Sequence, residues 1–303
     1  GYGALSSETQ GDRNVAIGAY ALFAQNNTSN TDVYNVAIGY QAGTNVTTGT
    51  ANTLIGGLSG STITTGIDNV VLGYNALSTE DTGSRSVAIG REALRDQNYN
   101  GSAYNVAIGH QAGKNVTTGI QNTLIGGLAG DAITGANNNI AIGYLALTTE
   151  TSGSNNVAIG VTALQQSNGG TYNVAIGRDA GQSISTGVEN VLIGGLSGDA
   201  ITTAKYNVAV GHSSLSGNVQ GWKNVAIGQN ALKNMNPASP TDTYNVGVGH
   251  NSGISITTGI QNTLIGGLAG DVLTTGDNNV AIGYNALSSE DIGNGSVAIG
   301  AFA

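Results

Sequence analysis

The sequence of 303 residues has no cysteine, only two prolines and few charges. Charged residues make up 9% of the chain, against roughly 25% in an average domain. Without cysteine there is no disulfide framework and no thiolate metal site. With 9 basic against 18 acidic residues and no basic run, the chain lacks the patch that nucleic acids require. It also has no run of 18 apolar residues and no signal-peptide pattern, so we expect no membrane insertion by this segment.

Glycine and a repeated phrase are what the sequence has in abundance. Glycine contributes 49 residues and hydrophobic residues 39%, which excludes a disordered linker because enough apolar surface exists to drive collapse. The phrase reads "NVAIG" at 35–39, "NTLIG" at 52–56, "NVVLG" at 69–73 and "SVAIG" at 86–90. Its closing glycine recurs along the whole chain, and most of the intervals between successive closing glycines have the same 17-residue length.

A 17-residue period is too short for a helix pair or a propeller blade and fits one coil of a β-solenoid. We therefore predict an all-β fold, a parallel β-roll of about 18 coils. The residue four places after the closing glycine is Gly, Gly, Leu and Leu in successive coils, so four coils form a super-repeat.

The repeat predicts one continuous solenoid over residues 1–303, and we expect this segment to belong to a longer chain because both ends fall inside the repeat. The predicted super-repeats span residues 35–104, 105–172, 173–244 and 245–303, after a partial one at 1–34.

Side chains alternate along each predicted strand, so Val36 and Ile38 share one face and Ala37 lies on the other. We expect the Val and Ile face to form the solenoid core. The Asn that begins most phrases, such as Asn35 and Asn52, is expected to stack its amide on the next coil as a ladder.

The opposite face carries Ala in most coils and Leu in the second coil of each super-repeat. A position facing solvent would be polar, so both faces of the strand are predicted to be buried, the second against a neighbouring protomer. The residues expected at this protomer interface are Leu54, Leu124, Leu192 and Leu264.

The "N/S-V-A-I-G-x-x-A" phrase covers the chain and resembles the head repeat of trimeric autotransporter adhesins (YadA-like heads), which recurs in tail-fibre shafts of bacteriophages. "SVAIG" at 86–90 and 296–300 reproduces the motif. The resemblance implies a left-handed parallel β-roll, a homotrimer with three chains around one axis, and a role in attachment. The 17-residue coils and the four-coil super-repeat depart from the usual repeat of that family.

Three histidines and several acidic turns are the candidates for chemistry. The histidines occupy a slot that elsewhere holds Tyr, Arg or Gln, so we expect packing at a surface or interface, with metal capture by three symmetry-related histidines as the alternative. They are His110, His212 and His250. The acidic turns are expected to be solvated and to bind no metal, and they contain Glu8, Glu80, Asp81, Glu150, Glu290 and Asp291.

Insertions occur at one place in the super-repeat, in the loops 23–34, 95–104, 165–172 and 233–244. Insertions in solenoids lie on one face, which is often the binding face. Each loop ends in a tyrosine, which either packs onto the roll or contacts a surface glycan. The candidate glycan contacts are Tyr34, Tyr104, Tyr172 and Tyr244.

Taken together, the sequence predicts a structural and adhesive segment of an extracellular fibre, at a cell surface or on a virion. We expect no enzymatic activity and no cofactor, and as partners a homotrimer of this chain and a surface glycan or host-cell receptor. Two alternatives remain open: a glycan-cleaving enzyme resembling the β-helical tailspikes, which needs two carboxylates in a groove, and a soluble ligand-binding or ice-binding solenoid.

Overall fold

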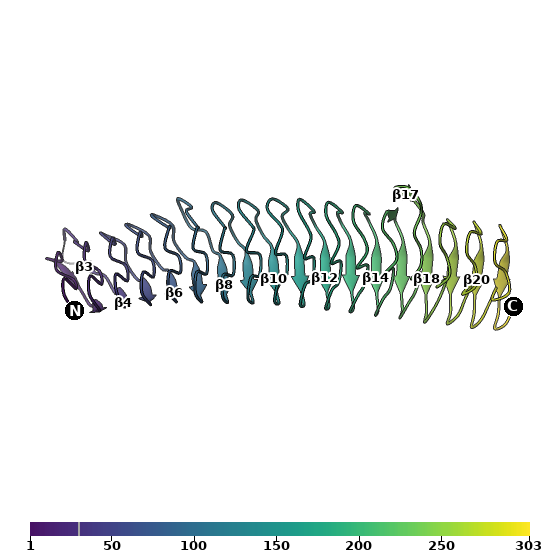
Figure 1. Cartoon of the computed structure of the whole chain (residues 1–303), viewed down its shortest axis with the longest axis horizontal. Coiled ribbons are helices and arrows are strands. Elements are labelled where there is room, and N and C mark those ends of the chain that lie inside the picture. The colour runs from purple at the N-terminus through teal and green to yellow at the C-terminus, as the bar shows by residue number, and fades with distance from the viewer. Residues whose placement is uncertain (30) are drawn as a thin grey trace. The chain divides into compact units, whose positions relative to one another are not determined.

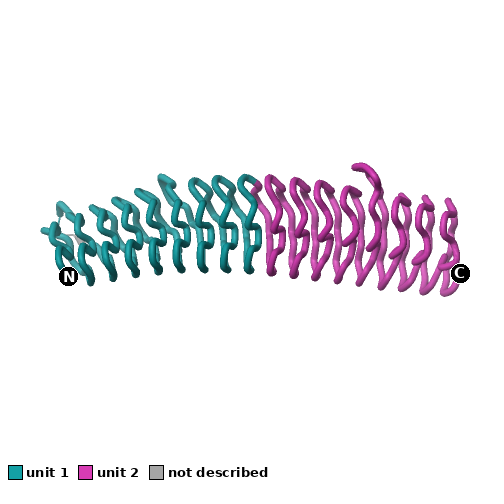
Figure 2. Tube along the Cα trace, in the orientation of Figure 1, with its two compact units in different colours: residues 1–152 teal, residues 153–303 magenta. Residues whose placement is uncertain are grey.

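The computed structural model describes residues 1–29 and 31–303 and divides into two compact units, Gly1–Ser152 and Gly153–Ala303 (Figure 2). Each unit is a stack of short parallel strands, with no helix in the described residues (Figure 1). The fold is therefore an all-β parallel β-solenoid of about 17 turns. The division falls inside the super-repeat expected at 105–172, and the single continuous segment stays a prediction.

In the first unit, eight strands of three residues form a parallel stack in which Ala37 pairs with Leu54 and Leu54 with Val71. The strands are β2 (Val15–Ile17), β4 (Val36–Ile38), β5 (Thr53–Ile55), β6 (Val70–Leu72), β7 (Val87–Ile89), β8 (Val106–Ile108), β9 (Thr123–Ile125) and β10 (Ile140–Ile142). A second ladder joins β1 (Gly11–Asp12) to β3 (Thr31–Asp32).

In the second unit, nine strands of three residues continue the same pattern, and Ala175 pairs with Leu192. The strands are β11 (Val157–Ile159), β12 (Val174–Ile176), β13 (Val191–Ile193), β14 (Val208–Val210), β16 (Val225–Ile227), β18 (Val246–Val248), β19 (Thr263–Ile265), β20 (Val280–Ile282) and β21 (Val297–Ile299). The two-residue strands β15 (Gly221–Trp222) and β17 (Thr241–Asp242) form a second ladder. The sequence count of 18 coils also included Gly1, which has no strand before it.

The face of the strand that lies inside the coil is the opposite of the one expected. The middle residue is buried, as at Ala37 and Val71, which are 0% exposed, whereas Val70 and Leu72 are 41% and 45% exposed. The expectation that the Val and Ile face forms the core is therefore wrong. Strict alternation shows that two faces differ but not which one is inside, and a narrow coil accommodates the smaller Ala.

The proposed interface role of the leucines is wrong for the same reason. All four are 0% exposed within a single chain, so their side chains cannot contact a neighbouring protomer: Leu54, Leu124, Leu192 and Leu264. They are core residues of the solenoid.

The Gly, Gly, Leu, Leu order of the super-repeat is explained by how the core is filled. A Cβ at Gly43 or Gly60 would lie 2.5 or 2.9 Å from the methyl groups of Leu54, because that leucine occupies the space of two coils. In the next two coils the strand centre is smaller, and the fully buried Leu77 and Leu94 enter the core from the turn instead. The leucine that fills the core therefore comes from the strand in some coils and from the turn in others.

The glycine that closes each phrase is required by its backbone and by its neighbour. Gly56 has φ of +128°, where L side chains are disfavoured, and a Cβ there would lie 2.6 Å from the carbonyl oxygen of Gly73. Adjacent coils therefore lie too close together at this corner for a side chain, and only glycine fits.

The asparagine ladder is confirmed. The Asn52 side chain donates to Asn35 Oδ1 at 3.3 Å and to the Gly66 carbonyl at 2.8 Å. Asn69 repeats the pattern on Asn52 and Gly83. These amides are 0% exposed, so the ladder satisfies polar groups inside the coil, as buried polar groups require.

Candidate functional site

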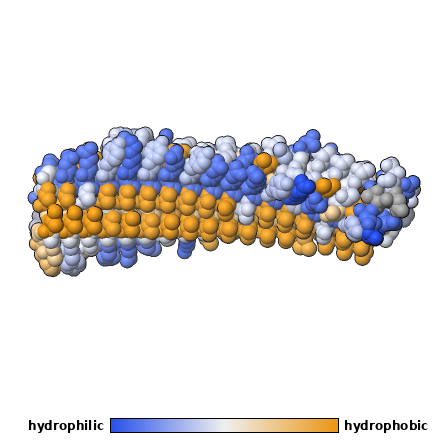
Figure 3. Space-filling view, turned by 180° about the vertical axis from the view of Figure 1, so that it is seen from behind, coloured by the Kyte–Doolittle hydropathy of each residue, from blue (hydrophilic) through white to orange (hydrophobic). Residues whose placement is uncertain are grey.

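An uncharged apolar stripe runs along each unit on the outer face of the strands, and Figure 3 shows it as two rows of orange spheres. We define the apolar stripe as the first and third residues of the three-residue strands. Its members are Val, Ile and Leu except for Thr in some second coils. The most exposed are Val15, Ile17, Val70, Leu72, Ile140, Ile227, Ile265, Ile282, Val297 and Ile299.

The size of the stripe sets it apart from scattered apolar residues. Eight strands about 4.8 Å apart, each with two outward side chains roughly 6.6 Å apart, cover on the order of 250 Å² in the first unit. The largest contiguous apolar patch of a soluble monomer is commonly a few hundred Å² and is often functional. The stripe is therefore the strongest candidate interaction surface of each unit.

A column of exposed residues borders the stripe at the start of the strands. We call it the pre-strand column, and it consists of the residue before each ladder Asn or Ser. The four predicted tyrosines lie here with positive φ, and their exposed fractions are 53%, 52%, 60% and 47% for Tyr34, Tyr104, Tyr172 and Tyr244. These tyrosines are therefore about half exposed, and a contact with a glycan stays a prediction.

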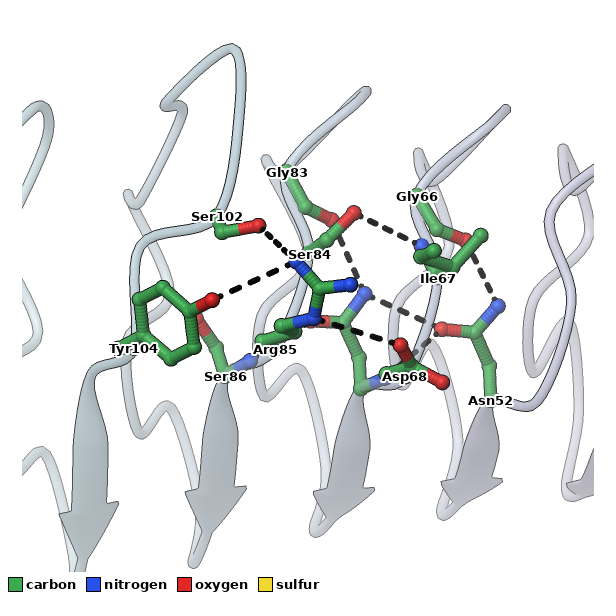
Figure 4. A network of polar contacts seen from close by, with 11 residues as sticks. Asn52, Gly66, Ile67, Asp68, Gly83, Ser84, Arg85, Ser86, Ser102 and Tyr104 are labelled. Atoms are coloured by element: carbon green, nitrogen blue, oxygen red, sulfur yellow. Dashed lines mark hydrogen bonds and ion pairs between the residues drawn. The ribbon is translucent and has the colours of Figure 1, made fainter.

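A cation from the preceding coil lies against three of these rings. Figure 4 shows Arg85, whose guanidinium donates to Ser102 Oγ at 2.7 Å and to the Tyr104 hydroxyl at 3.4 Å. Its Cζ lies 5.9 Å from the Tyr104 ring centroid, and its Nε lies 3.5 Å from Asp68. The ring is thereby fixed at the edge of the stripe by a cation–π contact.

The two 21-residue coils add an aspartate to this arrangement. Lys223 Nζ lies 4.9 Å from the Tyr244 ring centroid and donates to Asp242 at 2.6 Å, which raises the pKa of the ammonium. Arg13 contacts Tyr34 and Asp32 in the same way. The loop 23–34 contains residue 30, which lies outside the described residues.

The acidic turns differ from the expectation of solvated side chains. Asp81 and Asp291 are exposed, but Glu80 and Glu150 are 0% exposed. Glu80 Oε1 accepts from the Gly83 amide at 2.8 Å, and its Oε2 accepts from Gln97 Nε2 at 2.9 Å. Glutamate serves here as a buried acceptor for turn amides, because the turn folds back over its own carboxylate.

Burial raises the pKa of Glu80, against the lowering effect of its hydrogen bonds from Gln97 and the turn amides. Glu8 occupies the equivalent turn. Burial there also acts to raise the pKa, but hydrogen bonds from Gln25 and from turn amides outweigh it and lower the pKa to about 2. For both carboxylates, the causes of the pKa shift are burial and hydrogen bonds from amides.

The third super-repeat replaces the acid with a neutral pair. Asn218 stands at the position of Glu80 and accepts from the Gly221 amide at 2.6 Å, while the buried Met235 stands at the position of Gln97. We expect Glu80→Asn to lower the free energy of unfolding by about 2 kcal/mol, because the buried Gln97 amide nitrogen loses one of its two acceptors and keeps only Ser86 Oγ. Adding Gln97→Met should cost at least about 1 kcal/mol less than the sum of the single changes. Denaturant unfolding measures all four variants of the cycle, and additive losses would contradict the pairing.

The histidines lie in a second exposed column, at the other end of the strands. We call it the post-glycine column, and it consists of the residue after each closing glycine. His110, His212 and His250 are exposed there, which is the packing position expected from the sequence. Within residues 1–29 and 31–303, no group of three His, Cys, Asp or Glu side chains is placed to hold a metal ion.

Comparisons with known proteins do not assign the chain to a family. No protein-family model matches it, and no curated protein matches its sequence. None of the described segments forms a helix long and apolar enough to cross a membrane.

Proposed function

We propose that this chain is a non-enzymatic, structural and adhesive segment of an extracellular fibre, on a cell surface or a virion. Three copies assemble side by side as a homotrimer, and each coil is left-handed, as the resemblance of the repeat implies. The apolar stripe is the protomer interface. This assignment replaces the buried leucines that the sequence alone had indicated.

The single observation that carries the proposal is the apolar stripe that runs along each unit, outside coils whose own apolar core is already filled. Inside the coil, leucines fill the core and asparagines satisfy one another. Burying the outer Val and Ile side chains against another copy contributes about 25 cal/mol for each Å² removed from water. Regular spacing lets two copies pack row against row along their length.

Charging the stripe should dissociate the assembly. For the native chain, we expect sedimentation to give a particle mass three times the 30.2 kDa of one chain. The triple variant Val70→Lys, Leu72→Lys, Ile227→Lys should sediment as a monomer, because each ammonium would lose its hydration in the interface. These side chains are 41%, 45% and 40% exposed, so the coil itself should stay folded. Sedimentation velocity and circular dichroism together measure both outcomes.

A matched control places the same three charges away from the stripe. Thr65, Thr118 and Thr258 are exposed in the turns, and lysine at these positions should leave the trimer intact. A native chain that sediments as a monomer, or a stripe variant that remains trimeric, would overturn the proposal.

Attachment is the second part of the proposed function. Surface glycans remain candidate ligands of the four loops, since exposed aromatic faces stack on sugars and repeated weak contacts add in avidity. The arginine or lysine lying against Tyr34, Tyr104 and Tyr244 covers part of those rings. The glycan would therefore engage the free side of each ring or the outer loop residues.

A further inference from the structure

Four glycines in the post-glycine column are not required by the coil that contains them. They occur once per super-repeat and always in its second coil: Gly57, Gly127, Gly195 and Gly267. None has a positive φ. A Cβ would lie 3.6, 3.4, 3.5 and 3.6 Å from its nearest neighbour, which is ordinary van der Waals contact. The same column holds Tyr, His, Arg, Gln, Val or Ala in the other coils, so a side chain fits there and the reason for glycine lies outside the coil.

Each of these glycines forms the floor of a notch between two larger side chains. Tyr40 and Tyr74 border the first notch, and both rings are more than half exposed. Arg178, Asp179, Leu196 and His212 surround Gly195 in the third super-repeat, where the surface hollow measures about 440 Å³. The notch is thus wide enough to accept a side chain and is open to solvent.

The pre-strand column carries a matching projection once per super-repeat. Each of the four tyrosines Tyr34, Tyr104, Tyr172 and Tyr244 precedes one of the notch glycines, and the spacing along the chain is the same in all four pairs. A fifth residue of this kind, Tyr206, is followed at the same spacing by Gln229 and has no notch. Projections and notches therefore share one period and lie at opposite ends of the strands, on the two sides of the apolar stripe.

We propose that each tyrosine of one protomer inserts into the glycine notch of the neighbouring copy and fixes the axial register of the assembly. This inference rests on the proposed self-assembly. In a closed ring of parallel copies, the contact is heterologous, and one side of each stripe meets the other side of the next. The tyrosine column and the notches are the two surfaces that such a ring brings together.

A register device is needed because the stripe specifies the register only weakly. Slipping one copy by a coil, about 4.8 Å, places Val and Ile rows on Val and Ile rows again except at the threonines of some second coils. Register is weakly specified wherever a pattern matches itself after a shift. A tyrosine that meets a filled position instead of a notch would clash, so only a slip of four coils restores the fit, and it leaves four coils of each copy uncovered.

The test replaces Tyr172 by the photoreactive analogue p-benzoylphenylalanine in chains mixed with ¹⁵N-labelled chains. After illumination and trypsin digestion, we expect adducts between labelled and unlabelled chains on the peptide 179–205, which contains Gly195. Filling the notch with Gly195→Gln should reduce these adducts at least about tenfold, which corresponds to 1.4 kcal/mol. Gln229 occupies the same column, so the filled coil should fold.

The outcomes separate this inference from the function on which it rests. Monomeric chains in sedimentation would overturn the self-assembly itself. A trimer whose adducts fall mainly on residues 206–223, one coil away, or are unchanged by Gly195→Gln would overturn the register device alone. A trimer without adducts in which the Tyr172 analogue lowers binding to immobilised surface polysaccharide would assign the ring to a glycan instead.

Discussion

Replacing Leu192 by Ala is expected to lower the free energy of unfolding by about 2–5 kcal/mol, the range for leucines deleted from well-packed cores. Leu192 is fully buried and fills the space above Gly181 and Gly198, where a Cβ would lie 2.8 Å from its methyl groups. Denaturant unfolding at matched protein concentration measures the loss, since association adds its own concentration-dependent stability.

A compensating change sharpens this prediction. Adding Gly198→Leu to Leu192→Ala copies the strand centre and the turn leucine of the next coil, Ala209 and Leu215. The Ile201 side chain, whose methyl group lies 2.9 Å from a Cβ at Gly198, must shift to admit the new leucine. The backbone is suited to it, because Gly198 and Leu215 have φ of 55° and 54°. We expect the double variant to recover about half of the stability that Leu192→Ala loses. A double variant no more stable than the single one would contradict the exchange of leucine between strand and turn.

Substitution by alanine should affect stability very differently at the two adjacent glycines of the second coil, Gly56 and Gly57. Gly56→Ala is expected to cost more than about 4 kcal/mol, because the new methyl meets the backbone of Gly73 at 2.6 Å and φ is +128°. Gly57→Ala should change the stability of the coil by less than about 1 kcal/mol, since its Cβ lies 3.6 Å from the Tyr74 ring.

Thermal unfolding and circular dichroism of the two variants provide the comparison, with each serving as the control for the other. Equal losses would show that the close approach of coils at Gly56 is not what requires glycine there. A folded, unperturbed Gly56→Ala variant would contradict the packing of the whole corner, because the same contact recurs at most closing glycines.

The repeat predicted the class of fold because the backbone N–H and C=O groups of one coil can form hydrogen bonds only with the neighbouring coils. A 17-residue period left a parallel solenoid as the only architecture, and the recurring Asn52 and Asn69 predicted the ladder that the structure contains. Those features follow from spacing alone, and spacing is what a sequence records directly.

The direction of the side chains did not follow from spacing. Val70 and Val71 are adjacent and equally apolar, yet one is 41% exposed and the other 0%, so hydrophobicity could not say which was inside. The glycine pairs held the missing signal: Gly43 and Gly60 leave room only if Leu54 points inward. Likewise, Glu80 looked like a solvated acid because its acceptor role depends on a turn that folds back over it.

The candidate surfaces were predicted unevenly. Loop insertions drew attention to the four tyrosines, but the sequence left open whether they pack onto the roll or contact a glycan. The arginine or lysine beside three of the rings could not be predicted, since residues such as Arg85 and Tyr104 lie in different coils and meet only when successive coils stack. The apolar stripe was seen in the sequence but assigned to the core.

The parallel ladder has a mechanical consequence. Within each unit the backbone hydrogen bonds run from one coil to the next, as from Val36 to Asn52 and from Thr53 to Asn69. A pull along the stack therefore loads all the bonds of one boundary at the same time rather than opening them in turn. The boundary must rupture collectively, and failure of one coil would release only that coil's own length of chain before the next boundary bears the load. Such a stack can dissipate the energy of a pulling force in small, repeatable unfolding steps.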